Sequence, residues 1–227
     1  MENASYELIM LTIQQNNAAV RMLKEGRAME AFQLLSRTCR DAHAARSDEH
    51  PSYHRMYQYT WRDCSKALAH KMKGTRNFSE GSISFLALQF LSIEDPFRYR
   101  QKDKQVSVQE FLWVLWYNLA IVSILVGSPV GAPGIGLLHQ SLDLFRLVQS
   151  VVVPEPLSKH WLMLKLSILN NEACVHNELA QSHESFDRLV KMGLALSKMS
   201  GLLDPKEQER FLWTVKTMVD TRYAAAA

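Results

Sequence analysis

Residues 111–142, in the middle of the chain, contain no Asp, Glu, Lys or Arg. Within this stretch, residues 111–126 are almost continuously apolar. A helix that is hydrophobic on every side is stable only when other elements bury all of its faces. The apolar part is shorter than the ~20 residues that cross a membrane, and Asn118 interrupts it. We therefore expect a buried helix at the centre of a helical core and no transmembrane segment; the alternatives are an apolar groove for a partner or contact with a membrane surface.

Apolar residues recur at helical spacing through most of the chain. Nine glycines and seven prolines among 227 residues disfavour a turn-rich β fold. No linker divides the sequence, so we expect a single all-α domain over residues 1–227. Its expected helical hairpins span about 5–46, 51–93, 106–153 and 157–200, and a capping helix follows over 205–222. Asp204 is the expected N-cap of that last helix, with Pro205 in its first turn.

Two segments fit this helical pattern less clearly. Pro51 is placed to open a helix, with Tyr53, Tyr57 and Trp61 on one stripe. Residues 83–93 fit either a short helix or a strand, because a short apolar run is compatible with both. The helical context favours a helix here, and we identify no secure strand in the sequence.

Three stretches of the sequence share one pattern of residues. Each has an asparagine followed nine positions later by a turn residue: Asn17 and Gly26, Asn118 and Gly127, Asn171 and Ala180. Each also has one small residue two positions after the asparagine and another on the next helix: Ala19 and Ala31, Ala120 and Ser141, Ala173 and Ser185. Small residues at these places let two helices pack closely as a hairpin. Such a hairpin must stack on neighbours to bury its apolar face.

The pattern resembles the tetratricopeptide repeat (TPR) family, and the copies around Asn17 and Asn171 match it best. The resemblance implies a right-handed superhelical solenoid of antiparallel helical hairpins with a concave groove for partners. The sequence departs from the family in spacing, because the copies lie 101 and 53 residues apart rather than ~34. The middle copy has a longer turn, which we assign to residues 128–136, and the third copy has Ala180 where the family has glycine.

The aligned asparagines are the candidate binding site. The resemblance implies a ladder that holds an extended peptide by its backbone, because one amide side chain donates to a C=O and accepts from an N–H. The candidate residues are Asn17, Asn118, Asn171, Asn16, Tyr117, Asn170 and Asn177. The alternative is that these asparagines fix the packing of the helices themselves. The chain lacks the lysine-then-asparagine pattern with which family members hold chaperone tails.

Cysteine usage and the first residues bear on the compartment. Cys39, Cys64 and Cys174 are odd in number and widely spaced, which is typical of free thiols in a reducing compartment. The first residues show no secretory signal. We therefore expect an intracellular protein, either cytoplasmic or nuclear.

The sequence contains no recognisable catalytic motif. His50 and His54, beside Asp48 and Glu49, are the strongest metal candidates, but His50 directly precedes Pro51 at a helix boundary and a third ligand is not obvious. The glycines of residues 131–136 lack the G-K-[ST] ending of a phosphate loop. We expect a non-enzyme that needs neither a metal nor another cofactor.

The charge pattern indicates the kind of partner. The net charge of +3 is too small to indicate nucleic acid. Basic residues gather in 62–76 and 98–104, which reads as a solvated face or as a docking patch for an acidic surface. We expect a protein–protein interaction module, a scaffold or adaptor, that binds a partner protein or extended peptide in the concave groove. The alternatives are a structural subunit of a larger multiprotein assembly and, less favoured, an RNA-binding repeat protein. The latter would stack bases on Tyr53, Tyr57, Tyr59 and Trp61 beside the basic run 62–76.

Overall fold

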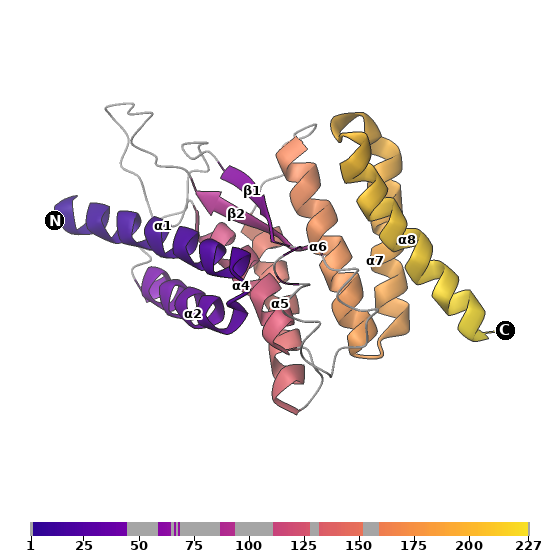
Figure 1. Cartoon of the computed structure of the whole chain (residues 1–227), viewed down its shortest axis with the longest axis horizontal. Helices are drawn as coiled ribbons and strands as arrows, with labels where there is room; N and C mark the ends of the chain where they lie inside the picture. Colours follow the sequence, from indigo (N-terminus) through magenta and orange to yellow (C-terminus); the bar gives the residue numbers. More distant parts are fainter. Residues whose placement is uncertain are drawn as a thin grey trace. The chain divides into compact units, whose positions relative to one another are not determined.

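The computed structural model describes residues 2–44, 59–64, 66, 68, 87–93, 111–127, 132–151 and 159–226 (Figure 1). These residues are predominantly helical, as predicted. The helices are α1 (Glu2–Lys24), α2 (Ala28–Ala44), α4 (Leu112–Gly127), α5 (Ala132–Val151), α6 (Lys159–Glu178), α7 (Ser182–Met199) and α8 (Pro205–Ala226). Strands β1 (Tyr59–Asp63) and β2 (Gln89–Ile93) form a two-stranded sheet, and a short 3-10 turn covers Ser200–Leu202.

The chain divides into two compact units. The N-terminal unit comprises Met1–Asn77 and Leu88–Val153, and the C-terminal unit comprises Phe78–Ala87 and Pro154–Ala227. In the N-terminal unit, α1 packs on α2, α2 on α4 and α4 on α5, and β2 contacts both α1 and α4. In the C-terminal unit, α6 packs on α7, and α8 contacts both of them. The helical pairs α1–α2, α4–α5 and α6–α7 therefore contain the three sequence copies.

The first and third copies end their first helix in the same way. Gly26 has a φ of 72° and Ala180 has a φ of 56°. The N–H of each donates to the C=O three residues earlier, Leu23 and Asn177, at 3.0 Å in both cases. The N–H of the following residue donates to the C=O five residues earlier, which completes the helix-ending pattern that favours glycine. The alignment of Ala180 with Gly26 is thus confirmed as a structural equivalence.

The small residues of the three copies lie where the pattern predicts them. The six residues are all fully buried: Ala19, Ala31, Ala120, Ser141, Ala173 and Ser185. Four positions after the second small residue of each copy, a larger residue is also buried: Leu35, Phe145 and Leu189. The three hairpins therefore share one packing pattern.

Helix α4 is the centre of the N-terminal unit. Fourteen of its residues are buried, which confirms the prediction from the uncharged stretch. The ring of Tyr117 packs edge-on against Trp61 at 5.9 Å between centroids and tilted against Phe145 at 6.3 Å. Among the described residues, none of the helices combines the length and the hydropathy of a membrane span.

The sheet corrects two predictions. Residues 59–63 are strand β1 rather than part of a helix that begins at Pro51, and residues 89–93 are strand β2 rather than a helix. In both cases tertiary contacts outweigh local periodicity, because β2 lies against α1 and α4 and pairs with β1. The rest of the predicted 51–93 hairpin lies mostly outside the described residues.

The first turns of helices α5 and α8 test two further predictions. Helix α5 begins at Ala132, so the loop assigned to residues 128–136 is wrong in its second half, which forms the first turn of the helix. Helix α8 begins as predicted: Asp204 Oδ1 accepts from the Glu207 N–H at 2.9 Å, and Glu207 Oε2 accepts from the Asp204 N–H at 3.0 Å. This reciprocal pair is a capping box.

Replacing Ala180 by glycine should stabilise the protein. A residue with a Cβ is strained at this positive φ, so Ala180→Gly should raise the free energy of unfolding by about 0.5–1 kcal/mol. Gly26→Ala should lower it by a similar amount. The measurement is urea denaturation, and Gly201→Ala is the matched control, because an added Cβ at Gly201 meets nothing within 4 Å. A destabilised Ala180→Gly variant would contradict the equivalence of the two turns.

Candidate functional site

The residues just before and within β2 present their backbone groups to two different edges. β1 and β2 pair antiparallel, with Trp61 opposite Leu91 and Asp63 opposite Gln89. The Cys64 N–H donates to the Leu88 C=O at 3.1 Å, so the even-numbered residues face β1. Successive residues of a strand point their backbone groups to opposite edges. Residues 87, 89, 91 and 93 therefore direct their N–H and C=O groups away from β1.

In the N-terminal unit, two asparagines bind this second edge, and each holds both backbone groups of one residue. Asn118 Oδ1 accepts from the Leu91 N–H at 2.9 Å, and its Nδ2 donates to the Leu91 C=O at 2.8 Å. Asn17 Oδ1 accepts from the Ile93 N–H at 2.9 Å, and its Nδ2 donates to the Ile93 C=O at 2.7 Å. Each amide therefore replaces the backbone of a neighbouring strand.

The third aligned asparagine makes the same contact in the C-terminal unit. Asn171 Oδ1 accepts from the Ala87 N–H at 2.7 Å, and its Nδ2 donates to the Ala87 C=O at 3.2 Å. Asn170 donates from Nδ2 to Asn171 Oδ1 at 3.1 Å and so orients that amide. We call Asn17, Asn118 and Asn171 the bidentate asparagines.

Asn16 and Tyr117 complete the polar contacts of the strand edge. The Tyr117 hydroxyl donates to the Gln89 C=O at 2.9 Å. Asn16 Nδ2 donates to the Leu91 C=O at 2.9 Å, and its Oδ1 accepts from Asn118 Nδ2 at 2.8 Å. Asn16, Tyr117 and Asn118 are completely buried. A buried network with its members satisfied in this way favours one arrangement of the core.

Five of the seven predicted site residues thus bind backbone groups of the chain itself: Asn16, Asn17, Tyr117 and Asn118 in the N-terminal unit and Asn171 in the C-terminal unit. Asn170 contacts the Asn171 amide instead. The seventh, Asn177, is exposed at the end of α6, where its C=O accepts from the Ala180 N–H at the turn. The sequence did not predict which backbone these asparagines bind; the structure shows that it belongs to residues 87–93. The signal available was the apolar run from Ile83 to Ile93, which fits either a helix or a strand and for which the helical context favoured a helix.

The side chains of this segment are held as firmly as its backbone. Leu88, Phe90, Leu91 and Ile93 are each no more than 2% exposed. Burying one such side chain stabilises a fold by about 1.5–3 kcal/mol. Residues 88–93 therefore belong to the core of the N-terminal unit, and each bidentate asparagine already holds both backbone groups of one residue.

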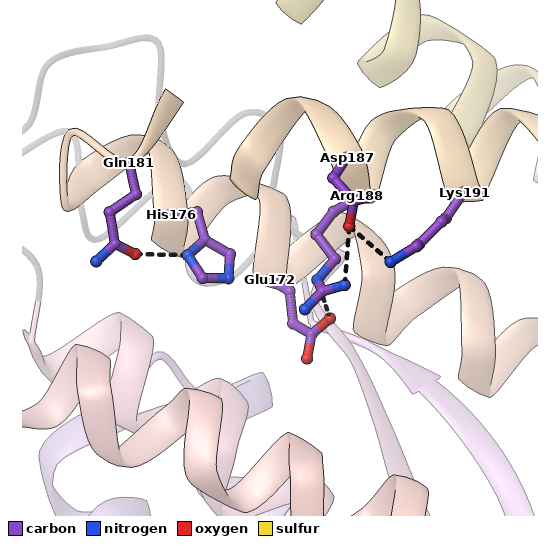
Figure 2. A network of polar contacts seen from close by, with 6 residues as sticks. All are labelled: Glu172, His176, Gln181, Asp187, Arg188 and Lys191. Atoms are coloured by element: carbon purple, nitrogen blue, oxygen red, sulfur yellow. Dashed lines mark hydrogen bonds and ion pairs between the residues drawn. The ribbon is translucent and has the colours of Figure 1, made fainter. Parts of the chain in front are cut away.

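A second polar group joins α6 to α7 within the C-terminal unit (Figure 2). Arg188 reaches from α7 to Glu172, whose Oε2 lies 2.9 Å from Arg188 Nε in an otherwise buried position. Asp187 is within 3.1 Å of Arg188 and 2.7 Å of Lys191, and the hydrogen bond from Lys191 holds the pKa of the Asp187 carboxyl below its usual value. A buried carboxylate is stable only with such a partner, so this ion pair fixes α7 against α6.

His176 belongs to the same helical pair. Its Nδ1 lies 2.6 Å from Gln181 Oε1, which is a hydrogen-bond distance (Figure 2). This contact joins the end of α6 to the turn before α7. In the described part of the chain, three or more His, Cys, Asp or Glu side chains nowhere gather as a metal site. His50 and His54 lie outside the described residues.

The three cysteines are buried free thiols. Burial raises the pKa of Cys39 to about 12, of Cys64 to about 11 and of Cys174 to about 12. Because the thiolate is the reactive form, these side chains are poor nucleophiles in the folded protein.

Comparisons with family models, curated proteins and solved structures find no match to this chain.

Replacing Asn118 by alanine should destabilise the fold strongly. The variant leaves the buried Leu91 N–H without its acceptor and also removes the contact to Asn16. We expect the free energy of unfolding to fall by about 2–4 kcal/mol in urea denaturation. Asn177→Ala is the matched control at an exposed position and should change it by less than about 0.5 kcal/mol. Equal effects of the two variants would contradict the role of the buried edge.

The thiols should react with Ellman's reagent only when the protein unfolds. At pH 8 the folded chain should release almost no chromophore within minutes, whereas addition of 6 M guanidinium chloride should release three equivalents at once. The reason is burial together with the raised pKa of each thiol. Rapid reaction of any cysteine in the folded protein would show that its burial is transient.

Proposed function

We propose that this chain is a non-enzymatic protein–protein interaction module, a scaffold or adaptor built as a TPR-like solenoid of helical hairpins. The shared turn geometry of Gly26 and Ala180 supports the repeat. The buried small residues of all three copies support it further. Stacked hairpins of this kind provide an extended surface for partners.

The observation that carries the proposal is a row of exposed apolar side chains on α7. Phe186, Val190 and Leu194 follow one another at intervals of four residues and therefore share one face of the helix. They are 43%, 43% and 55% exposed. Large apolar side chains aligned in this way on a surface are typical of a protein-binding site. We call these three residues the α7 stripe.

The α7 stripe is a better partner surface than the asparagines. The bidentate asparagines are occupied by residues 87–93, so they stabilise the scaffold that presents the stripe. A fixed subunit of a larger assembly would use the same stripe, with a partner that does not exchange.

A second candidate is the capture of an extended peptide in place of residues 87–93. The contacts of the asparagines go to backbone atoms, which every sequence possesses, and this favours a site that accepts any extended segment. The competing strand is covalently attached and deeply buried, so a peptide would have to offset the burial of Leu88, Phe90, Leu91 and Ile93.

Loss of partner binding should follow changes in the α7 stripe. Leu194→Glu should weaken capture of a partner by at least about tenfold, because burial of a leucine is worth about 1.5–3 kcal/mol. The melting temperature of the Leu194→Glu variant should stay close to that of the unchanged chain. The measurement is quantitative co-purification from cells, followed by titration of the purified partner. Leu147→Glu, on α5 at 45% exposure, is the matched control and should retain the partner.

The same experiment separates the two candidates. Asn118→Ala should lower the melting temperature without selective loss of a partner. If Asn118→Ala loses a partner that Leu194→Glu retains, after correction for the folded fraction, peptide exchange is the better account.

A further inference from the structure

We infer that the α7 stripe binds a second copy of this chain, through an antiparallel pair of α7 helices related by a two-fold axis. This inference rests on the proposed function, because it assigns a partner to the same surface.

The charges beside the stripe divide the helix into two halves. Glu184 and Asp187 lie in its first half, and Lys191 and Lys198 lie in its second half. At 100° per residue, these four side chains fall along the same flank of the α7 stripe. Glu184, Lys191 and Lys198 are exposed, and Asp187 retains 40% of its side-chain surface. One flank is therefore acidic toward the start of α7 and basic toward its end.

A two-fold axis perpendicular to the helix at Val190 makes this pattern self-complementary. The axis places Phe186 opposite Leu194 of the second copy and brings the two charged flanks to the same side of the pair. Glu184 then lies within two residues, about 3 Å along the axis, of the level of Lys198 in the second copy. Asp187 has the same relation to Lys191. In a parallel pair, the acidic half of each flank would lie at the level of the acidic half of the second copy, and the basic half at the level of the basic half. Like charges would then be neighbours.

Two further features suit α7 to such a pair. An added Cβ at Gly193, on the other flank of the stripe, would meet nothing within 4 Å, so the backbone there is open to close approach by another helix. At 100° per residue, Arg188 falls on the face of α7 opposite the stripe. Its ion pair with the buried Glu172 holds α7 against α6 (Figure 2). The stripe is therefore presented on a fixed helix, and little order has to be gained on association.

The test is sedimentation equilibrium of the full chain over a series of concentrations, with circular dichroism to confirm folding. We expect a monomer–dimer equilibrium. Phe186→Glu and Leu194→Glu should each raise the dissociation constant at least tenfold, and the control Leu147→Glu should leave it unchanged.

Charge reversal tests the antiparallel geometry separately. Glu184→Lys and Lys198→Glu should each weaken the dimer about tenfold at low salt, because the two-fold axis repeats every contact. The double variant with both changes should restore the dimer. An equimolar mixture of the two single variants should also recover association, as a heterodimer, because both of its contacts between positions 184 and 198 then pair a lysine with a glutamate.

The outcomes distinguish this inference from the proposed function. A chain that stays monomeric at every concentration overturns the inference, and the proposed function then stands only if Leu194→Glu loses a different protein. A dimer that persists in Leu194→Glu uses another surface and also overturns the inference. A third outcome is that the stripe variants lose the dimer, but the double charge reversal associates no better than the single charge variants. This outcome overturns the antiparallel arrangement.

Discussion

The hydrogen bonds at the second edge of β2 are the constraint on which the N-terminal unit depends. A buried N–H or C=O without a hydrogen-bond partner lowers the stability of a fold by about 1–3 kcal/mol. One edge of β2 is satisfied by β1, and the other faces helices, whose own backbone groups are already used. Asparagine side chains supply the missing donors and acceptors from Asn17 and Asn118. Their presence lets a strand pack inside an otherwise helical unit.

The central position of α4 follows from the same arrangement. Its apolar faces contact α2, α5 and β2, and its single amide at Asn118 is directed to Leu91. An asparagine in so apolar a helix would destabilise the core without a partner, but here it holds the strand that helps to bury the helix. The stability of α4 and that of β2 are therefore coupled. The α7 stripe differs from these buried contacts, because its apolar side chains remain on the surface of the folded chain.

The sequence predicted much of the fold and the residues of the site, but not their occupant. Helices with long periodic patterns were recognisable, and so were the turns at Gly26 and Ala180 and the capping residue Asp204. The asparagines were recognisable because they recur nine residues before a turn. The strands were not, because five-residue segments have too few turns or alternations to separate strand from helix. The prediction that an extended backbone binds the asparagines concerned a partner; the structure shows residues 87–93 in that role.

Local chemistry in the sequence by itself determined the helices, their caps and the need to bury residues 111–126. Helix formation and capping depend on residues within a few positions of one another, so the sequence order carries them directly. Tertiary structure alone decided that residues 89–93 form a strand and that Asn16, some 75 residues away, shares the Leu91 carbonyl with Asn118. It also decided which apolar residues of α7 stay exposed. These outcomes depend on contacts between distant segments, because a buried backbone edge selects its partners by position in space rather than by position in the chain.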